Sequence, residues 1–130
     1  MKNVIVIDDQ PYIRKLLIEE ITEIGYQVYG FEPERNIIES IRKVNPDLII
    51  LDLYMGSPDG FDIFKDIKTL FPALPVIIFT AYDGFKNDPL ISSADAYIVK
   101  SSVLEPLKQE ITELAAQSQQ YISMQECLLR

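Results

Sequence analysis

The run from Leu48 to Leu51 constrains the fold of this chain most, because it is entirely aliphatic and ends on an acid, Asp52. Continuous hydrophobic runs of this length are typical of strands that are buried on both faces of a parallel sheet. A single acid at a strand end often does no more than meet solvent or cap the next helix. Whether Asp52 has a chemical role therefore depends on the residues at the ends of the other strands.

Four further β-rich segments alternate with segments whose apolar residues recur at helical spacing. Short connections between such strands and helices predict an α/β fold, in which helices cover both faces of a parallel sheet. Five strands in the flavodoxin-like order 2-1-3-4-5 would form a doubly wound (βα)5 domain. The predicted strands are Val4–Ile7, Tyr26–Phe31, Leu48–Leu51, Val76–Phe79 and Ala96–Val99, and the predicted helices are 11–24, 34–44, 61–71 and a last one from Val103 onward.

Polar residues follow four of the predicted strands. Asp8 and Asp9 follow the first strand, Asp52 the third, Thr80 the fourth and Lys100 the fifth. The functional crevice of such a sheet lies beyond the carboxyl ends of its strands. In the predicted order these four strands are neighbours, so we expect the five side chains to converge on one site.

Composition excludes several classes of function. A chain of 130 residues with 48% hydrophobic residues is one ordinary domain rather than a disordered segment. No apolar run reaches the roughly 18 residues of a membrane span. The net charge of −8 argues against direct nucleic-acid binding and favours basic partners or cations. The absence of histidine excludes histidine catalysis and histidine-ligated zinc, and the single cysteine, Cys127, fits a reducing cytoplasm.

The expected cluster of side chains suits magnesium-assisted phosphoryl transfer. Three neighbouring carboxylates repel one another unless a cation compensates them, and Mg²⁺ prefers oxygen ligands. A carboxylate can also act as a nucleophile and form an acyl phosphate. Phosphoryl transfer then needs mainly positioning and neutralisation of the phosphoryl oxygens. Lys100 and Thr80 would supply a positive charge and a hydroxyl group for those oxygens.

Five motifs occur in order along the chain and together are specific. They are Val6-Ile7-Asp8-Asp9-Gln10, the run from Pro46 to Met55, Asp59-Gly60, Phe79-Thr80-Ala81 and the run from Ala94 to Lys100. On these motifs the chain resembles a response-regulator receiver domain of two-component signalling over about residues 2–116. The segment 8–29 is especially similar to stand-alone receivers of sporulation phosphorelays.

This resemblance implies that Asp52 accepts a phosphoryl group from a histidine kinase or a phosphotransfer protein. It implies a Mg²⁺ (or Mn²⁺) site formed by Asp9, Asp52 and the backbone carbonyl of Tyr54, with Asp8 acting through water. The protein would then be a phosphoprotein rather than an enzyme, catalysing only its own phosphorylation and dephosphorylation.

The resemblance also implies how the signal is transmitted. Thr80 would swing toward the phosphoryl group, Lys100 would form an ion pair with it, and Tyr97 would turn inward on activation. A downstream protein or an output domain would respond to this change. No nucleic acid or membrane is implied as a direct partner.

Several positions depart from the usual receiver pattern. Ser101 stands where a proline commonly follows the lysine, and a trans peptide bond is expected there because the cis form costs roughly 2.5–4 kcal/mol. Residues 84–93 contain turn formers, which predicts that the fourth helix is short, displaced or frayed. Gly56 would loosen the loop beside Asp52. Large residues at Tyr54 and Tyr82 predict slow self-dephosphorylation.

The end of the chain leaves two interpretations open. We expect a receiver domain over residues 1–116, with 117–130 as an extension of the last helix or as a linker or tail. In the first interpretation the helix ends near Ala116 and a disordered tail follows. In the second, a longer helix pairs with a second chain to form a homodimer or leads into an output domain. Apolar residues at a 3-4 spacing fit the second: Leu107, Ile111, Leu114, Tyr121 and Leu128.

Two other functions compete with the phosphorylated switch. A pseudo-receiver would keep the fold and mediate only protein contacts, which Ser101 and the shortened fourth helix would allow. A magnesium-dependent phosphohydrolase that forms an aspartyl phosphate would need a second acid two residues after its nucleophile, where this chain has Tyr54.

Overall fold

The computed structural model describes residues 2–34, 36–53 and 60–129, and for 118–129 it describes the backbone only. Its core is a five-stranded parallel sheet in the order β2-β1-β3-β4-β5, which confirms the predicted fold class. The strands are β1 Asn3–Ile7, β2 Gln27–Phe31, β3 Leu48–Leu51, β4 Val76–Thr80 and β5 Ala96–Val99. The helices are α1 Pro11–Glu23, α2 Ile37–Val44, α3 Gly60–Leu70 and α4 Glu105–Leu129, with a short 3₁₀ helix, η1, at Pro89–Ile91.

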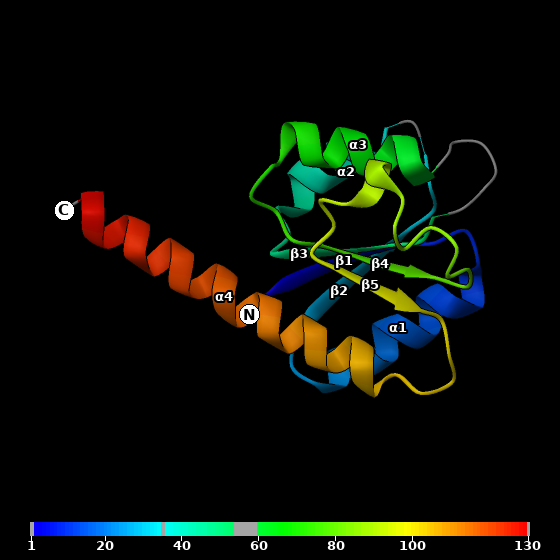
Figure 1. Ribbon diagram of the computed structural model, residues 1–130. Helices are drawn as coiled ribbons and strands as arrows, with labels where there is room; N and C mark the ends of the chain where they lie inside the picture. Colours follow the sequence, from blue (N-terminus) through cyan, green and yellow to red (C-terminus); the bar gives the residue numbers. More distant parts are fainter. Residues whose placement is uncertain (1, 35, 54–59, 130) are drawn as a thin grey trace.

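Helices cover both faces of the sheet, α2 and α3 one face and α1 and α4 the other (Figure 1). Successive residues of a strand point to opposite faces, so β1 and β3 contribute to both layers of core. Ile5, Ile7, Ile49 and Leu51 pack with residues of α2 and α3. The residues between them pack with α1 and α4: Val4, Val6, Leu48 and Ile50. All eight are buried, which explains why these strands are uninterrupted aliphatic runs.

The helix ends follow local sequence signals. Pro11 occupies the first turn of α1, where its missing N–H costs no hydrogen bond. Gly25 follows the helix with a positive φ of 101°, a conformation that glycine adopts without strain. Asn45 caps α2 in the left-handed region with φ 52°. The predicted start of α2 at residue 34 is wrong by three residues, because a turn from Glu34 to Ile37 precedes the helix.

The connection between β4 and β5 contains no α-helix, in contrast to the other strand connections on the described part of the chain. Hydrogen-bonded turns at 84–87 lead into η1, whose first turn is capped by Asp88 accepting from the backbone N–H of Leu90. The prediction of a shortened fourth helix is therefore confirmed. The predicted effect of Gly56 falls outside the described residues.

The last helix, α4, extends well beyond the body of the domain (Figure 1). Leu107, Ile111 and Leu114 in its first half are buried against the sheet and α1. The helix runs past Ala116 to Leu129 and leaves the domain at the end of the sheet opposite to the carboxyl ends of the strands. Its backbone at the point of exit is tied to the first residues of the chain, since Lys2 donates to the carbonyl oxygen of Ala115.

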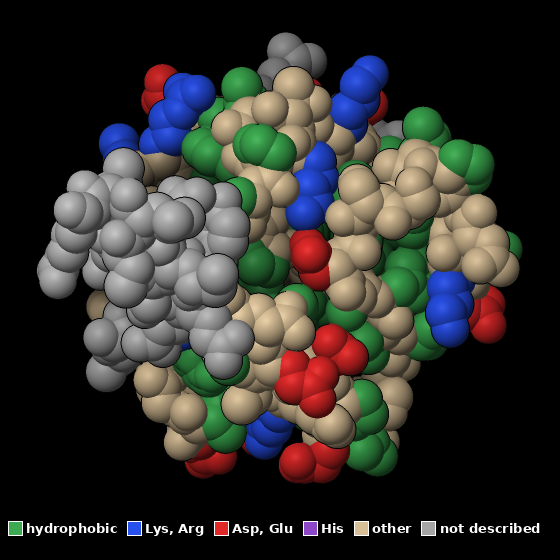
Figure 2. Space-filling model, turned by 60° about the vertical axis from the view of Figure 1, so that its left-hand side comes forward, with side chains coloured by type: hydrophobic (Ala, Val, Ile, Leu, Met, Phe, Trp, Pro, Cys, Tyr) green, Lys and Arg blue, Asp and Glu red, His purple; other side chains and the backbone are tan. Residues whose placement is uncertain are grey.

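The described surface shows no segregation of charge on the face seen in Figure 2. Hydrophobic, acidic and basic side chains are interspersed there. Among the described residues, no helix is both long enough and apolar enough to cross a membrane.

Candidate functional site

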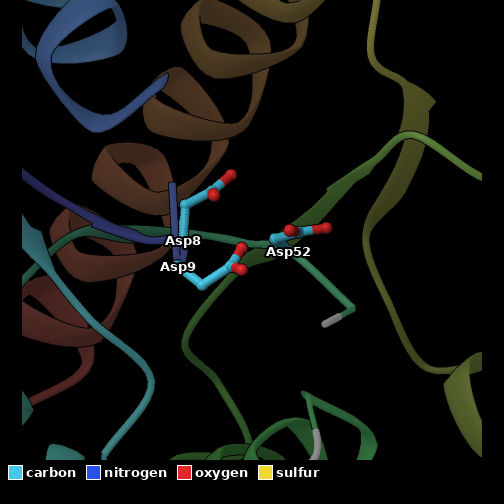
Figure 3. Close-up of side chains that lie close together, drawn as sticks. All are labelled: Asp8, Asp9 and Asp52. Atoms are coloured by element: carbon cyan, nitrogen blue, oxygen red, sulfur yellow. The ribbon is translucent and has the colours of Figure 1, made fainter. Parts of the chain in front are cut away.

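Asp8, Asp9 and Asp52 converge at the carboxyl end of the sheet (Figure 3). The parallel register pairs Ile7 of β1 with Leu51 of β3, so the acids that follow these residues are neighbours. The backbone N–H of Asp52 continues the ladder by donating to the carbonyl of Ile7 at 3.0 Å. One carboxylate oxygen from each acid lies within 4.8 Å of the others. Asp8 and Asp52 are buried, with 2% and 8% of their surface exposed.

Lys100 is brought to the same cluster by β5. Its backbone N–H donates to the carbonyl of Thr80 at 2.7 Å, which continues the pairing of β4 with β5. Its ammonium nitrogen lies 2.8 Å from Asp8 Oδ2 and 3.1 Å from Asp52 Oδ2. A longer contact of 3.4 Å joins it to the side-chain oxygen of Gln10. One cation therefore serves two of the three acids.

The electrostatics of the cluster favour a further positive charge. Burial raises the pKa of Asp52 and the Asp8 carboxylate raises it further, whereas the charge of Lys100 and hydrogen bonds from Lys100 and Thr80 oppose this rise. Burial alone would lower the pKa of Lys100, but its hydrogen bond to Asp8 and the charges of both acids raise it. Lys100 therefore stays charged, and its ammonium contacts two of the three carboxylates, those of Asp8 and Asp52. An all-oxygen, electron-rich set of this kind fits a hard divalent cation such as Mg²⁺.

A cavity of about 660 Å³ opens beside the acids. Thr80 lies at its wall as the last residue of β4 and is almost fully buried, with 3% of its surface exposed. Nearby backbone and side chains form the rest of the described lining: Asp9, Gln10, Asp52, Leu53, Ala81, Tyr82, Phe85 and Lys100. Four of the five predicted strand-end residues thus line one cavity, and the fifth, Asp8, lies in contact with Lys100 behind it.

Gln10 and Phe85 are among the residues that line the cavity without a role predicted from the sequence. Gln10 directly follows the acid pair, so its position next to Asp9 was a usable signal. Phe85 lies in the connection between β4 and β5, where turn residues predict the loss of a helix but not the direction of an aromatic side chain. Its ring meets those of Phe61 and Tyr82 edge to face, each at a centroid distance of 4.9 Å.

Tyr97 lies on β5 outside the described lining of the cavity. Its hydroxyl donates to the backbone carbonyl of Tyr82, and burial raises its pKa. The ring packs against the core layer beneath α2 and α3. Tyr97 is thereby joined to the segment that forms the cavity wall, although it does not touch the acids. Tyr54, the predicted source of a backbone ligand, lies outside the described residues.

A parallel sheet in this order with an acidic site at its carboxyl edge defines a receiver-type domain. The chain belongs to the response regulator receiver domain family, which matches residues 4–112. The resemblance predicted from the motifs is confirmed. The family acts as the signalling module of two-component response regulators.

Curated relatives include both short and long proteins. The chain is 35% identical to sporulation initiation phosphotransferase F of Bacillus subtilis over 62% of this chain and 65% of that protein. It is 29% identical to the chemotaxis protein CheY of Thermotoga maritima over 83% of this chain and 96% of that protein. It is also 38% identical to the transcriptional regulator NtrC of Proteus hauseri, but there it spans only 17% of the relative's length.

Solved structures agree with this assignment. The response regulator protein TrrA from Thermotoga maritima, in complex with Mg(2+)-BeF, matches with a TM-score of 0.83 and 34% identity. The match covers 88% of this chain and 99% of TrrA. TrrA in complex with the histidine kinase ThkA matches with a TM-score of 0.81 over 88% of this chain.

Proposed function

We propose that this chain is a phosphorylated signalling switch. It takes a phosphoryl group from a histidine kinase or phosphotransfer protein onto Asp52, in a reaction that depends on Mg²⁺. The observation that carries the proposal is the meeting of Asp9, Asp52, Lys100 and Thr80 at one cavity, with Asp8 in contact with Lys100. The Mg(2+)-BeF complex of TrrA and its complex with ThkA support the same function for a relative of similar length.

Each residue of the site has a role in this reaction. The Asp52 carboxylate is the nucleophile, and one of its oxygens forms the bond to phosphorus. Lys100, already 3.1 Å from Asp52, forms an ion pair with a phosphoryl oxygen, and the Thr80 hydroxyl donates a hydrogen bond to another. Asp9, Asp52 and the Tyr54 carbonyl would hold Mg²⁺, with Asp8 acting through water, and the ion would help to neutralise the phosphoryl oxygens. The protein then promotes only its own phosphorylation and dephosphorylation.

Phosphorylation would change the partner-binding surface through Thr80 and Tyr97. Thr80 moves toward the new phosphoryl group, which vacates space at the end of β4. Tyr97 turns inward and gives up its hydrogen bond to the Tyr82 carbonyl. A downstream protein or an output domain responds to the altered surface formed by β5 and the segment 82–95.

The second half of α4 is proposed to pair with the same helix of another copy. The receiver domain would then end near residue 116, and residues 117–130 would extend its last helix beyond the body. Light scattering on the whole chain and on a chain ending at Ala116 tests this. If the whole chain is a dimer and the shortened chain is a monomer, the pairing is supported. If both chains have the same oligomeric state, the pairing is contradicted.

Beryllofluoride binding tests the phosphorylated state without turnover. Amide NMR spectra would be compared before and after addition of Mg²⁺ and beryllofluoride to the wild type and to Asp52→Ala. We expect shifts at Thr80, Tyr97 and Lys100 in the wild type and none in the variant. If the wild type shows no shift, the chain is a pseudo-receiver that acts through protein contacts alone.

A further inference from the structure

The cavity beside Asp52 has an aromatic wall that the transfer of a phosphoryl group does not by itself require. At about 660 Å³ it falls within the range of sites that hold whole small molecules, roughly 300–1,000 Å³. Its described lining includes two acids, Asp9 and Asp52, together with Lys100 and Thr80. Tyr82 and Phe85, which follow β4 in the chain, add aromatic surface to the lining.

Phe85 reaches the cavity because the connection after β4 is a turn instead of a helix. The backbone N–H of Lys86 donates to the carbonyl of Asp83 and that of Asp88 donates to the carbonyl of Phe85, which closes two successive turns. Gly84 leaves room for the Tyr82 ring, which a Cβ at that position would overlap. These turns, in place of a helix, therefore set the position of the Phe85 ring at the cavity.

The position of the Phe85 ring is fixed from several sides. Phe61, in the first turn of α3, meets it edge to face at 4.9 Å, and so does Tyr82. The Tyr97 hydroxyl holds the backbone of the same segment through the Tyr82 carbonyl. An aromatic ring held in this way is a ready surface for a second aromatic ring, because aromatic pairs prefer edge-to-face or offset contacts.

We propose that Phe85 is a specificity-determining residue that packs against the imidazole ring of the phosphodonor. The proposal rests on the proposed phosphorylation of Asp52 and names the part of the donor that the cavity recognises. The imidazole leaving group, a planar and weakly polar ring, would lie against the Phe85 ring. The phosphoryl group would then lie between Asp52, Thr80 and Lys100. Donors whose leaving group has no ring would gain nothing from this wall.

Transfer of the phosphoryl group from the imidazole donor to Asp52 needs no further reactant. An oxygen of the Asp52 carboxylate forms the new bond to phosphorus as the bond between phosphorus and the ring nitrogen breaks. The electron pair of that bond stays on the ring nitrogen. The donor enters with a proton on its other ring nitrogen and leaves as neutral imidazole, so no further acid, base or oxidant is needed.

Two small phosphodonors, each with a phosphorus–nitrogen bond, can be compared to measure how much the imidazole ring contributes to the rate. Phosphoimidazole carries the ring and phosphoramidate does not. Rates of Asp52 phosphorylation would be measured with both for the wild type, Phe85→Ala, Phe85→Leu and Phe85→Tyr. We expect Phe85→Ala to lower the second-order rate constant for phosphoimidazole on the order of fivefold, the scale of one aromatic contact. The rate with phosphoramidate stays unchanged, and Phe85→Tyr keeps the wild-type preference.

Controls separate recognition from folding. Leu90→Ala is the matched variant, because Leu90 lies in the same connection with 68% of its surface exposed and does not line the cavity. Phe85→Leu keeps apolar volume should Phe85→Ala fail to fold, and it is expected to lose ring preference as well. Equal losses with both donors in Phe85→Leu would overturn the proposal and make Phe85 a packing residue. If the wild type is phosphorylated on Asp52 and the Phe85 variants react at the same rates with both donors, this proposal alone is overturned. If neither donor phosphorylates the wild type, the proposed function is overturned too.

Discussion

The ammonium nitrogen of Lys100 lies 2.8 Å from Asp8 Oδ2, which joins the end of β5 to an acid at the end of β1. These strands are not neighbours in the sheet, since β3 and β4 lie between them. Lys100 is also 3.1 Å from Asp52. A divalent cation that binds among the same carboxylates must therefore share them with an ammonium that is already present.

Removal of Lys100 should strengthen metal binding. We expect Lys100→Met to bind Mg²⁺ about tenfold more tightly, equivalent to about 1.4 kcal/mol, because a competing positive charge is lost. Isothermal titration calorimetry measures this directly. Lys68→Met is the matched control, since the Lys68 side chain is as deeply buried as that of Lys100 and forms a 2.9 Å ion pair with Asp95 away from the site. Unchanged or weaker binding in Lys100→Met would contradict the competition.

The charge on Asp52 should cost stability at neutral pH. Its pKa is raised above the ordinary 3.8, mainly by burial, so the folded state favours the protonated acid. The stabilisation from protonation is complete below pH 3.8 and is lost as the pH rises through the higher folded pKa. We expect Asp52→Asn to increase the free energy of unfolding at pH 7 without Mg²⁺ by about 0.5–2 kcal/mol.

Urea unfolding of the wild type and Asp52→Asn as a function of pH measures this difference. The advantage of the variant should shrink as the pH falls through the raised pKa of Asp52 and should be gone below pH 3.8, where both side chains are neutral. Asp66→Asn on the exposed face of α3 is the control for loss of any single negative charge. An Asp52→Asn variant less stable than the wild type at pH 7 would show that the ion pair with Lys100 outweighs the cost of burial.

Tyr82 should slow the loss of the phosphoryl group. It lines the cavity while 58% of its surface stays exposed, so it covers the route from solvent to Asp52. We expect Tyr82→Ala to shorten the phosphoryl half-life several-fold by admitting water, and Tyr82→Phe to leave it unchanged. Tyr54→Ala should act in the same direction. A half-life that is unchanged or longer in Tyr82→Ala argues against this shielding.

Residues 84–93 should exchange their amide hydrogens faster than α1. Turns and the three-residue η1 provide few hydrogen bonds there, whereas α1 has 13 residues of continuous helix. Hydrogen–deuterium exchange followed by mass spectrometry compares the two segments in one experiment. Protection across 84–93 equal to that of α1 would mean that this connection is as ordered as a complete helix.

The strand ends of the site were predictable from the sequence. Apolar runs predict β1, β3, β4 and β5, and a parallel sheet brings the carboxyl ends of its strands to one edge. Asp8, Asp52, Thr80 and Lys100 follow from this rule alone. Predicting that these residues lie close together requires the strand order and register but not the side-chain conformations.

Contacts that depend on side-chain direction were not predictable. Lys100 reaches Asp8 as well as Asp52 because its flexible stem crosses two strands, which strand order does not reveal. Phe85 turns into the cavity because two turns replace a helix, and the sequence indicates only that the helix is weak. The start of α2 was missed because its first turn continues into a hydrogen-bonded turn at Glu34 that resembles helix in sequence.

Phosphorylation of Asp52 itself tests the central claim most directly. The wild type and Asp52→Asn would be incubated with acetyl phosphate, with and without Mg²⁺, and the intact masses compared. We predict a gain of one phosphoryl group in the wild type only when Mg²⁺ is present, and none in Asp52→Asn. An equal gain in Asp52→Asn, or none in the wild type with Mg²⁺, would contradict the assignment of Asp52 as the phosphoacceptor.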